Sequence, residues 1–302
     1  MRKLLVIISS FLIIGGSFLF LAGFAMNNFD IMVLSTDTKI ERKVEIFKEV
    51  NNIKIDEDTN DIKIIKSLTD EYKVNYGESK KNKYNIYIDD NNNLIIKREK
   101  TLNFINLITQ ENPLIIEVPE SFNKDLVIDT STGNVEINID NKINNFDLTF
   151  STADVRVHNI TCNDIVLNGS TGDAYISYVK VLNNTEIKLS TGEVEIINLE
   201  TTSLKVDVNT NDIDLENITA DTINLETSTG DIIFNNLEFK KMYIQTSTGD
   251  VEGSLNHTIN NYNITSHCNT GENNLPSKLD GGIYTLNVQV STGDIEIIFA
   301  KN

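Results

Sequence analysis

A short phrase, Ser-Thr-Gly-Asp followed by an apolar residue, recurs nine times with small variations between Ser131 and Ile295 of this 302-residue chain. The residue before the glycine position is threonine in every copy, and successive copies lie 19 to 22 residues apart. The glycine position is occupied by Gly133, Ala153, Gly172, Gly192, Asn211, Gly230, Gly249, Gly271 and Gly293. A period of about 20 residues is typical of solenoid proteins, so the chain is predicted to be a stacked β-solenoid.

Apolar residues alternate with polar ones on both sides of each phrase. The fifth and seventh residues before the glycine position are apolar apart from Ser266 and Thr185, and those two and four residues after it are mostly apolar. Alternation with period two predicts a strand with one buried face on each side of a tight turn. Glycine or asparagine suits a turn that needs positive φ, so we expect a distorted turn at Ala153.

A second corner is predicted six residues after the glycine position, at Asn159, Asn198, Asn217 and Asn236. A coil of two strands and two corners cannot bury its apolar face alone, and stacking of coils joins these faces into one core. The predicted fold is therefore an all-β, parallel β-solenoid of about nine coils of about 20 residues each.

The N-terminus carries a long apolar segment. Met1-Arg2-Lys3 precedes an apolar run from Leu4 to Met26 that is long enough to span a bilayer. The basic residues before it predict a cytoplasmic N-terminus and an extracytoplasmic repeat domain. A cleaved signal peptide is the alternative, since Gly23-Phe24-Ala25 offers small residues for a peptidase, but its apolar core is usually shorter. We therefore assign residues 1–29 to a transmembrane anchor, which places the chain at the cell membrane as a single-pass protein.

Residues 30–125 lack the regular repeat but contain short β-type segments and one isolated echo of the turn, Thr59-Asn60-Asp61-Ile62. We expect irregular first coils and antiparallel strands here, because a solenoid needs a cap on its open edge. The segment from Leu102 to Asn112 is predicted to be a short helix or a loop. Residues 126–302 are assigned to the solenoid repeats.

The order of these features resembles a known family. An N-terminal anchor, the early Thr59-Asn60-Asp61-Ile62 turn, the strand Leu114-Ile115-Ile116-Glu117-Val118-Pro119 and the serial Ser-Thr-Gly-Asp coils are similar to the toast-rack, putative-adhesin family of bacterial envelope proteins, including LiaG-like proteins. The resemblance covers residues 40 to 302. It implies a β-solenoid outside the membrane, often associated with envelope-stress systems, and it brings no ligand or active site.

The residue after the glycine position is acidic in eight copies and is predicted to point outward, forming an acidic column along one edge. Its members are Asn134, Asp154, Asp173, Glu193, Asp212, Asp231, Asp250, Glu272 and Asp294. One interpretation is a row of weak calcium sites, because calcium prefers oxygen ligands. The favoured interpretation is that aspartate suits the turn and keeps the edge soluble, since the spacing does not match a calcium-binding nonapeptide repeat.

Catalysis is not expected. The three histidines, His158, His257 and His267, are scattered along the chain, and no Gly-rich phosphate loop, Cys-x-x-Cys or His-Glu-x-x-His motif occurs. Hydrolysis of glycans needs paired carboxylates, and the acids of the repeat are already explained by the turn. We therefore assign no catalytic, cofactor-binding or metal-ligating residue and no cofactor.

The two cysteines, Cys162 and Cys268, are predicted to be unpaired. They lie more than five coils apart, roughly 25 Å at 4.8 Å per coil, whereas a disulfide needs Cα atoms within about 7 Å. Cys268 is expected to point into the core.

The formal net charge of −18 excludes nucleic acid as a natural partner. The expected function is a non-catalytic, membrane-anchored interaction module, or putative adhesin, of the cell envelope, which contacts the membrane through its N-terminal helix and an envelope protein or wall polymer through its repeats. The alternatives are an envelope-stress accessory that binds cationic peptides and, less favoured, a glycan-active β-helix enzyme.

Overall fold

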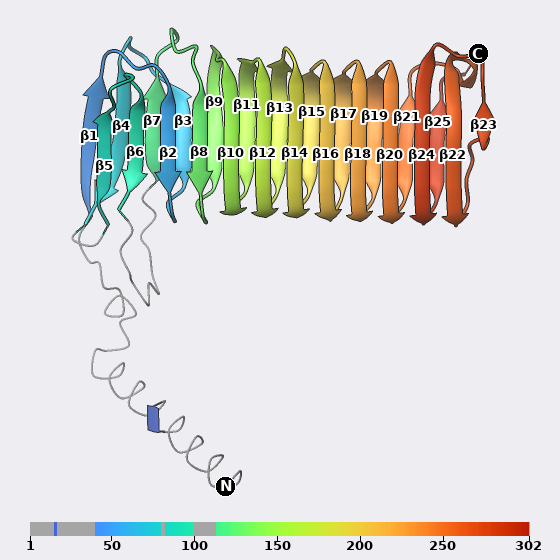
Figure 1. The fold of residues 1–302 in the computed structure, drawn as a ribbon, viewed down its shortest axis with the longest axis horizontal. Coiled ribbons are helices and arrows are strands. Elements are labelled where there is room, and N and C mark those ends of the chain that lie inside the picture. The colour runs from blue at the N-terminus through green and yellow to red at the C-terminus, as the bar shows by residue number, and fades with distance from the viewer. Residues whose placement is uncertain (1–14, 17–39, 80–81, 100–112, 302) are drawn as a thin grey trace.

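The computed structural model describes residues 15–16, 40–79, 82–99 and 113–301. Two long β-sheets face each other across a single apolar core and form a straight rod (Figure 1). Each regular coil adds one strand to each sheet, and consecutive coils pair in parallel. The prediction of an all-β parallel solenoid is confirmed.

The first sheet has 12 strands. In spatial order they are β1 (Glu41–Phe47), β4 (Tyr72–Glu78), β7 (Leu114–Val118), β3 (Ile62–Lys66), β9 (Val135–Lys142), β11 (Val155–Cys162), β13 (Ala174–Val181), β15 (Val194–Glu200), β17 (Ile213–Thr219), β19 (Ile232–Glu238), β21 (Val251–Leu255) and β25 (Ile295–Phe299). We call it the bent sheet, because several of its strands contain a residue with positive φ at which the strand bends.

The second sheet has 13 strands, and we call it the flat sheet. In the opposite spatial direction they are β23 (Lys278–Leu279), β22 (Tyr262–Thr270), β24 (Tyr284–Thr292), β20 (Lys241–Thr248), β18 (Thr222–Thr229), β16 (Ser203–Thr210), β14 (Asn184–Thr191), β12 (Asp164–Thr171), β10 (Asn145–Thr152), β8 (Leu126–Thr130), β2 (Ile53–Glu57), β6 (Leu94–Arg98) and β5 (Tyr84–Ile88). A short 3₁₀ helix, Ile259–Asn261, precedes β22.

The predicted inward positions form the core. All of the apolar residues five and seven places before the glycine position are buried, as are the two polar exceptions. Thr185 is hydrogen-bonded to Thr201, and the hydroxyl of Ser266 donates to the carbonyl of Pro276 over 2.8 Å. These two positions stay inside because each hydroxyl finds a partner there.

The turns of the repeat stack directly on one another. Seven of the nine glycine positions have positive φ, from 118° at Asn211 to 152° at Gly230. A Cβ on Gly249 would lie 1.9 Å from the carbonyl oxygen of Gly230, so glycine is required there by both conformation and space. Ala153 does not adopt positive φ, and neither does Gly133 in the first copy, so the difference is not specific to the alanine.

The predicted second corner is a bend rather than a reversal of the chain. Asn159 has a φ of 51°, yet it lies inside β11, and the residues after it continue to pair in parallel with β13. Asn198, Asn217 and Asn236 bend β15, β17 and β19 in the same way. The chain returns to the flat sheet a few residues later, so one left-handed residue redirects the strand without ending it.

Both ends of the rod depart from the order of the sequence. At the C-terminal end, β24 and β25 are inserted between the coil of β20 and β21 and the last long strand, β22. Eight of the nine predicted coils therefore have a strand in both sheets, while the coil at Gly271 contributes β22 and an isolated bridge from Asn273 to Ile295. Antiparallel β23 covers part of the edge of β22.

The N-terminal end is built in the same manner. β2 and β3 pair directly with β8 and β9, so the turn at Thr59 to Asp61 stacks under the first regular turn. β6 and β7 form the next layer outward, and antiparallel β1, β4 and β5 complete the end. These antiparallel strands blunt the edge of the rod.

Two predictions concern residues outside the described ranges. The apolar segment from Leu4 to Met26 lies there apart from Gly15 and Gly16, and the segment from Leu102 to Asn112 lies there entirely. Within the ranges that are described, no helix has the length and hydropathy needed to cross a bilayer.

Candidate functional site

The acidic column exists, and its carboxylates are part of a hydrogen-bond ladder. The backbone N–H of every member except Asp212 donates to the side-chain oxygen of the corresponding residue in the adjacent coil, at 2.7 to 3.2 Å. In spatial order the ladder runs through Asp61, Asn134, Asp154, Asp173 and Glu193, and then through Asp212, Asp231, Asp250, Asp294 and Glu272. Within the described part of the chain, one step lacks this bond: the N–H of Asp212 does not donate to the side chain of Glu193. The glutamate side chain is one methylene longer and does not reproduce the aspartate geometry.

The ladder explains the aspartate of the repeat without a metal. One oxygen of each aspartate carboxylate in the ladder accepts a backbone N–H of the adjacent coil, and Asn134 accepts one with its amide oxygen. Across the described part of the chain, no group of three or more His, Cys, Asp or Glu side chains is arranged to hold a metal ion. The column is thus a structural device that holds successive turns in register.

A group of acids lies where the ladder is broken. Burial raises the pKa of Glu193, and the charges of Asp214 and Asp173 raise it further. Burial also raises the pKa of Asp214, to which the neighbouring charge of Asp212 adds. This part of the bent sheet therefore carries mutually repelling carboxylates.

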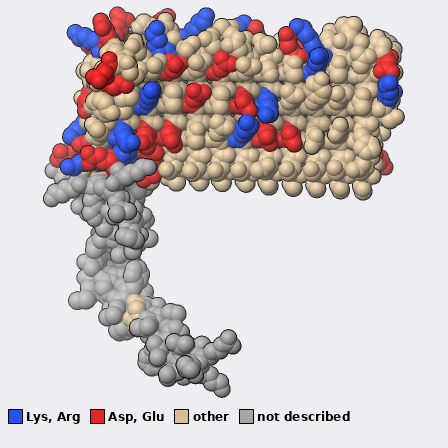
Figure 2. Space-filling view, viewed as in Figure 1, with Lys and Arg blue, Asp and Glu red and all other residues tan. Residues whose placement is uncertain are grey.

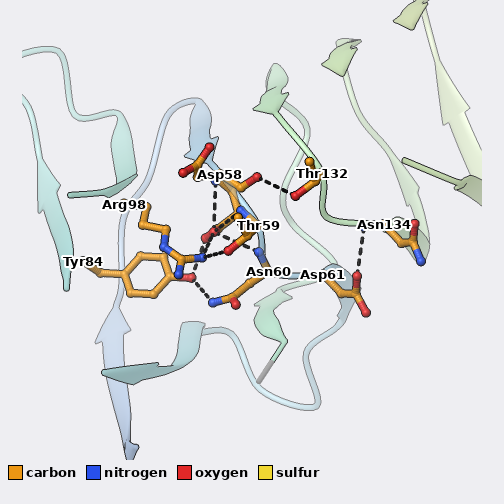
Figure 3. A network of polar contacts seen from close by, with 9 residues as sticks. Asp58, Thr59, Asn60, Asp61, Tyr84, Arg98, Thr132 and Asn134 are labelled. Atoms are coloured by element: carbon orange, nitrogen blue, oxygen red, sulfur yellow. Dashed lines mark hydrogen bonds and ion pairs between the residues drawn. The ribbon is translucent and has the colours of Figure 1, made fainter. Parts of the chain in front are cut away.

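The most deeply buried charges lie at the N-terminal end of the rod (Figure 3). Arg98 Nη1 lies 2.6 Å from Glu57 Oε1, and both side chains are almost completely buried. Glu57 also accepts the hydroxyl of Tyr84 and the backbone N–H groups of Asp58, Thr59 and Asn60. Burial and the charge of Glu57 raise the pKa of Tyr84 far above its usual range.

This buried network fixes the first turn of the stack. Glu57 lies opposite Thr130 in the flat sheet, so it occupies an inward position. Its carboxylate accepts hydrogen bonds from the N–H groups of this turn. The same turn also accepts two hydrogen bonds from the next coil. The hydroxyl of Thr132 donates to the carbonyl of Asp58, and the N–H of Asn134 donates to the carboxylate of Asp61. A carboxylate engaged in this way and shielded from solvent is a structural anchor rather than a general acid or base.

The histidines are not brought together. His158 Nδ1 lies 2.6 Å from the hydroxyl of Ser177, and its ring lies against Tyr175. His257 stacks on Tyr284 with ring centroids 4.9 Å apart, near the C-terminal end. His267 is exposed on β22.

A concavity follows the row of bends, and the sequence did not predict it. It is an open groove of about 810 Å³ whose walls come from five consecutive strands of the bent sheet, β9, β11, β13, β15 and β17. The residues with left-handed φ line it: Asp140, Asn159, Tyr178, Asn198 and Asn217. We call this the bend groove. It runs along the rod for roughly 20 Å at 4.8 Å per coil.

Tyr178 is the exception in this row. Its φ is 54°, close to the values of the asparagines on either side, and its side chain is 66% exposed. A bulky residue in the left-handed region is rare and strained. Alignment of the repeats would have revealed a tyrosine at an asparagine position, but the sequence alone does not place it in a groove.

Both cysteines are free, as predicted. Cys162 is buried at the end of β11, and burial together with the charge of Asp164 raises the pKa of its thiol to about 12. Cys268 faces inward but is partly exposed near the C-terminal end, and its thiol donates to the carbonyl of Gly293 over 3.2 Å.

Solved structures with the same architecture include two from Parabacteroides species. A putative adhesin from Parabacteroides distasonis ATCC 8503 is 13% identical, with a TM-score of 0.53, and the match covers 87% of this chain and 98% of that one. A putative adhesin from Parabacteroides merdae ATCC 43184 is 14% identical, with a TM-score of 0.50, and the match covers 87% of this chain and 97% of that one. At this level of identity the likeness establishes the fold alone.

No curated protein matches the chain. The family model described as Toastrack DUF4097 matches residues 50–297. This range takes in the Thr59 turn, the buried Glu57 network and every regular coil. The chain therefore belongs to the Toastrack DUF4097 family.

Proposed function

We propose that the protein is a non-catalytic, adhesin-type binding module of the bacterial cell envelope. Residues 1–29 would anchor it in the membrane, and the solenoid of residues 126–302, with its irregular N-terminal coils, would project outside the cell. The apolar run from Leu4 to Met26 behind Arg2 and Lys3 supports this topology.

The observation that carries the proposal is the bend groove. It is long, open and shallow, and it crosses five coils of a rigid rod. Such a surface suits an extended polymer better than a small substrate, which enzymes enclose in a deep pocket. The acids of the repeat support the same view, because the ladder already uses them to join the coils.

Capture from the cell envelope tests the proposal. Full-length protein, solubilised in detergent and immobilised, would be incubated with envelope fractions at low and high salt, with and without calcium. We expect saturable capture of a discrete component that survives high salt and does not require calcium. Lack of capture under every condition, or turnover of wall glycans by the protein, would contradict it.

A second candidate is binding of cationic peptides by an envelope-stress accessory. The repelling carboxylates around Glu193 and Asp214 favour it, since a cation would relieve their repulsion. In the view of Figure 2, by contrast, acidic and basic side chains are interspersed along the rod. Ion pairs such as those of Glu186 with Lys188 and Lys205 neutralise some of the acids. Peptide capture that is lost at high salt and after Asp214→Asn substitution would favour this candidate.

A further inference from the structure

We infer that the bend groove binds a neutral, linear oligosaccharide, with the ring of Tyr178 as its stacking platform. The inference rests on the proposed binding function and names the chemical class of the ligand. A sugar ring has an apolar C–H face and an edge of hydroxyl groups, so a site for it needs an exposed aromatic face flanked by groups that both donate and accept hydrogen bonds.

The first requirement is met at Tyr178. Its backbone is held at a φ of 54° where the adjacent bends at Asn159 and Asn198 have 51° and 58°. Asparagine tolerates this conformation and tyrosine does not, so the side chain is retained at a cost in stability. Two-thirds of its surface is exposed at the middle of the groove. A strained and exposed aromatic residue in a concavity indicates a binding role rather than a packing role.

The second requirement is met by the asparagines around it. On both sides of Tyr178, asparagine amides bond to an asparagine of the adjacent coil: Asn159 donates to Asn138 over 3.1 Å, and Asn236 donates to Asn217 over 2.5 Å. Next to Tyr178 this chain is interrupted, and the Asn198 side chain has no hydrogen-bond partner in the described part of the protein. An amide offers two donors and an acceptor, so Asn198 and the free carbonyl of Asn159 can pair with hydroxyl groups on either side of the ring.

Charge decides between classes of polymer. The groove contains two acids, Asp140 and Glu200, and two lysines, Lys142 and Lys180. Lys180 Nζ and Glu200 Oε1 lie 2.6 Å apart, which neutralises that wall. In a chain with a net charge of −18, a charge-balanced groove does not select a cationic peptide or an anionic wall polymer. A neutral chain of sugars fits this balance.

The inference is tested by calorimetric titration of full-length protein. The protein is held in a zwitterionic detergent, because detergents with sugar head groups would compete for the groove. The probes are the neutral hexasaccharides chitohexaose, cellohexaose and maltohexaose, with oligogalacturonate and oligolysine as charged comparisons. We expect at least one neutral hexasaccharide to bind and the charged probes not to compete with it.

Two substitutions at one position separate stacking from folding. Tyr178→Asn restores the residue that the other bends use, so the variant should fold at least as well as the wild type, yet it should lose binding by about tenfold or more. Tyr178→Phe keeps the ring and should keep most of the affinity. Tyr243→Asn removes a partly exposed tyrosine of the flat sheet, outside the groove, and should leave binding unchanged.

Each outcome has a definite meaning. Binding of no neutral hexasaccharide, or equal binding by the Tyr178→Asn variant, overturns the inference. If Tyr178→Asn protein nevertheless captures an envelope component as well as the wild type does, the proposed binding function stands and only its assignment to a glycan in the bend groove fails. If the wild type captures nothing from the envelope, the broader proposal fails as well.

Discussion

The backbone N–H of Asp294 donates to the carboxylate of Asp250 over 2.7 Å, although 44 residues separate the two in the sequence. Between them the chain passes through the outermost coil, where Glu272 donates in turn to Asp294. The last two coils are exchanged in space, since the coil of Gly293 lies between those of Gly249 and Gly271, and the ladder continues through them in this spatial order. It shows that the aspartate of the repeat serves the stack rather than its own coil.

Removal of one ladder acceptor should weaken the stack. Asp250→Ala leaves the N–H of Asp294 without its partner and is expected to cost about 1 kcal/mol in the free energy of unfolding. Asp250→Asn keeps an acceptor oxygen and removes charge repulsion, so it should be neutral or stabilising. Glu252→Ala, in the same coil, is the control with no ladder bond. Chemical denaturation of the three variants checks this, and equal destabilisation by Asp250→Asn and Asp250→Ala would contradict the role of the hydrogen bond.

The buried pair of Glu57 and Arg98 should be the most sensitive ionic contact in the described part of the rod. Arg98→Met leaves Glu57 buried without its cation and is expected to cost about 3–5 kcal/mol. Combining it with Glu57→Gln should recover part of this loss, because the uncompensated charge is then gone.

The adjacent residue provides the comparison for this pair. Lys97 lies 2.8 Å from Asp56, but both side chains are well exposed, so Lys97→Met should have a far smaller effect. Thermal unfolding of the variants measures the difference. Similar losses for Arg98→Met and Lys97→Met would refute the anchoring role of the buried network.

The repeat made most of the fold predictable from the sequence. The residues around Gly172 or Gly230 predict the turn, the two strands and the buried positions, because each coil repeats the same pattern of apolar and polar residues around its glycine. The exchanged coils were not predictable, since the pairing of Val251 with Ile295 is a tertiary contact that no local pattern encodes. The bend groove was missed for a similar reason: Tyr178 reads as an ordinary strand residue until its left-handed backbone is seen.

Stability near the broken step of the ladder should depend on pH. The pKa of Asp214 is raised in the folded protein, so its ionised form destabilises the fold at neutral pH. This penalty disappears as the pH falls below the unfolded value of about 4. Asp214→Asn should therefore stabilise the protein at pH 7, by less than about 1 kcal/mol because the group is partly solvated, and should have no effect at low pH.

The matched control for this pH dependence is Asp207→Asn. Asp207 lies in the flat sheet of the same coil, where its charge favours the protonated form of Lys188. Its loss should not stabilise the protein at pH 7. Melting curves at several pH values compare the two variants, and a stabilisation by Asp214→Asn that persists at low pH would show that charge is not its cause.

The two thiols should react at very different rates. Burial raises the pKa of Cys162 to about 12, so little thiolate is present and reagents cannot reach it. Cys268 is partly exposed and should be labelled first by a maleimide, whereas Cys162 should be labelled only on unfolding. Mass spectrometry after timed labelling follows both sites, with Cys268→Ser as the control that removes the early product. An early adduct on Cys162, or a disulfide between the two, would contradict the structure.

The most direct test of the binding account is hydrogen–deuterium exchange on full-length protein with and without saturating envelope material. The account predicts slower exchange at the bends around Asn159, Tyr178 and Asn198, and unchanged exchange at the acidic turns. Protection along the turns at Asp231 and Asp250 instead, or no protection anywhere on the rod, would contradict the claim that the bend groove is the binding surface.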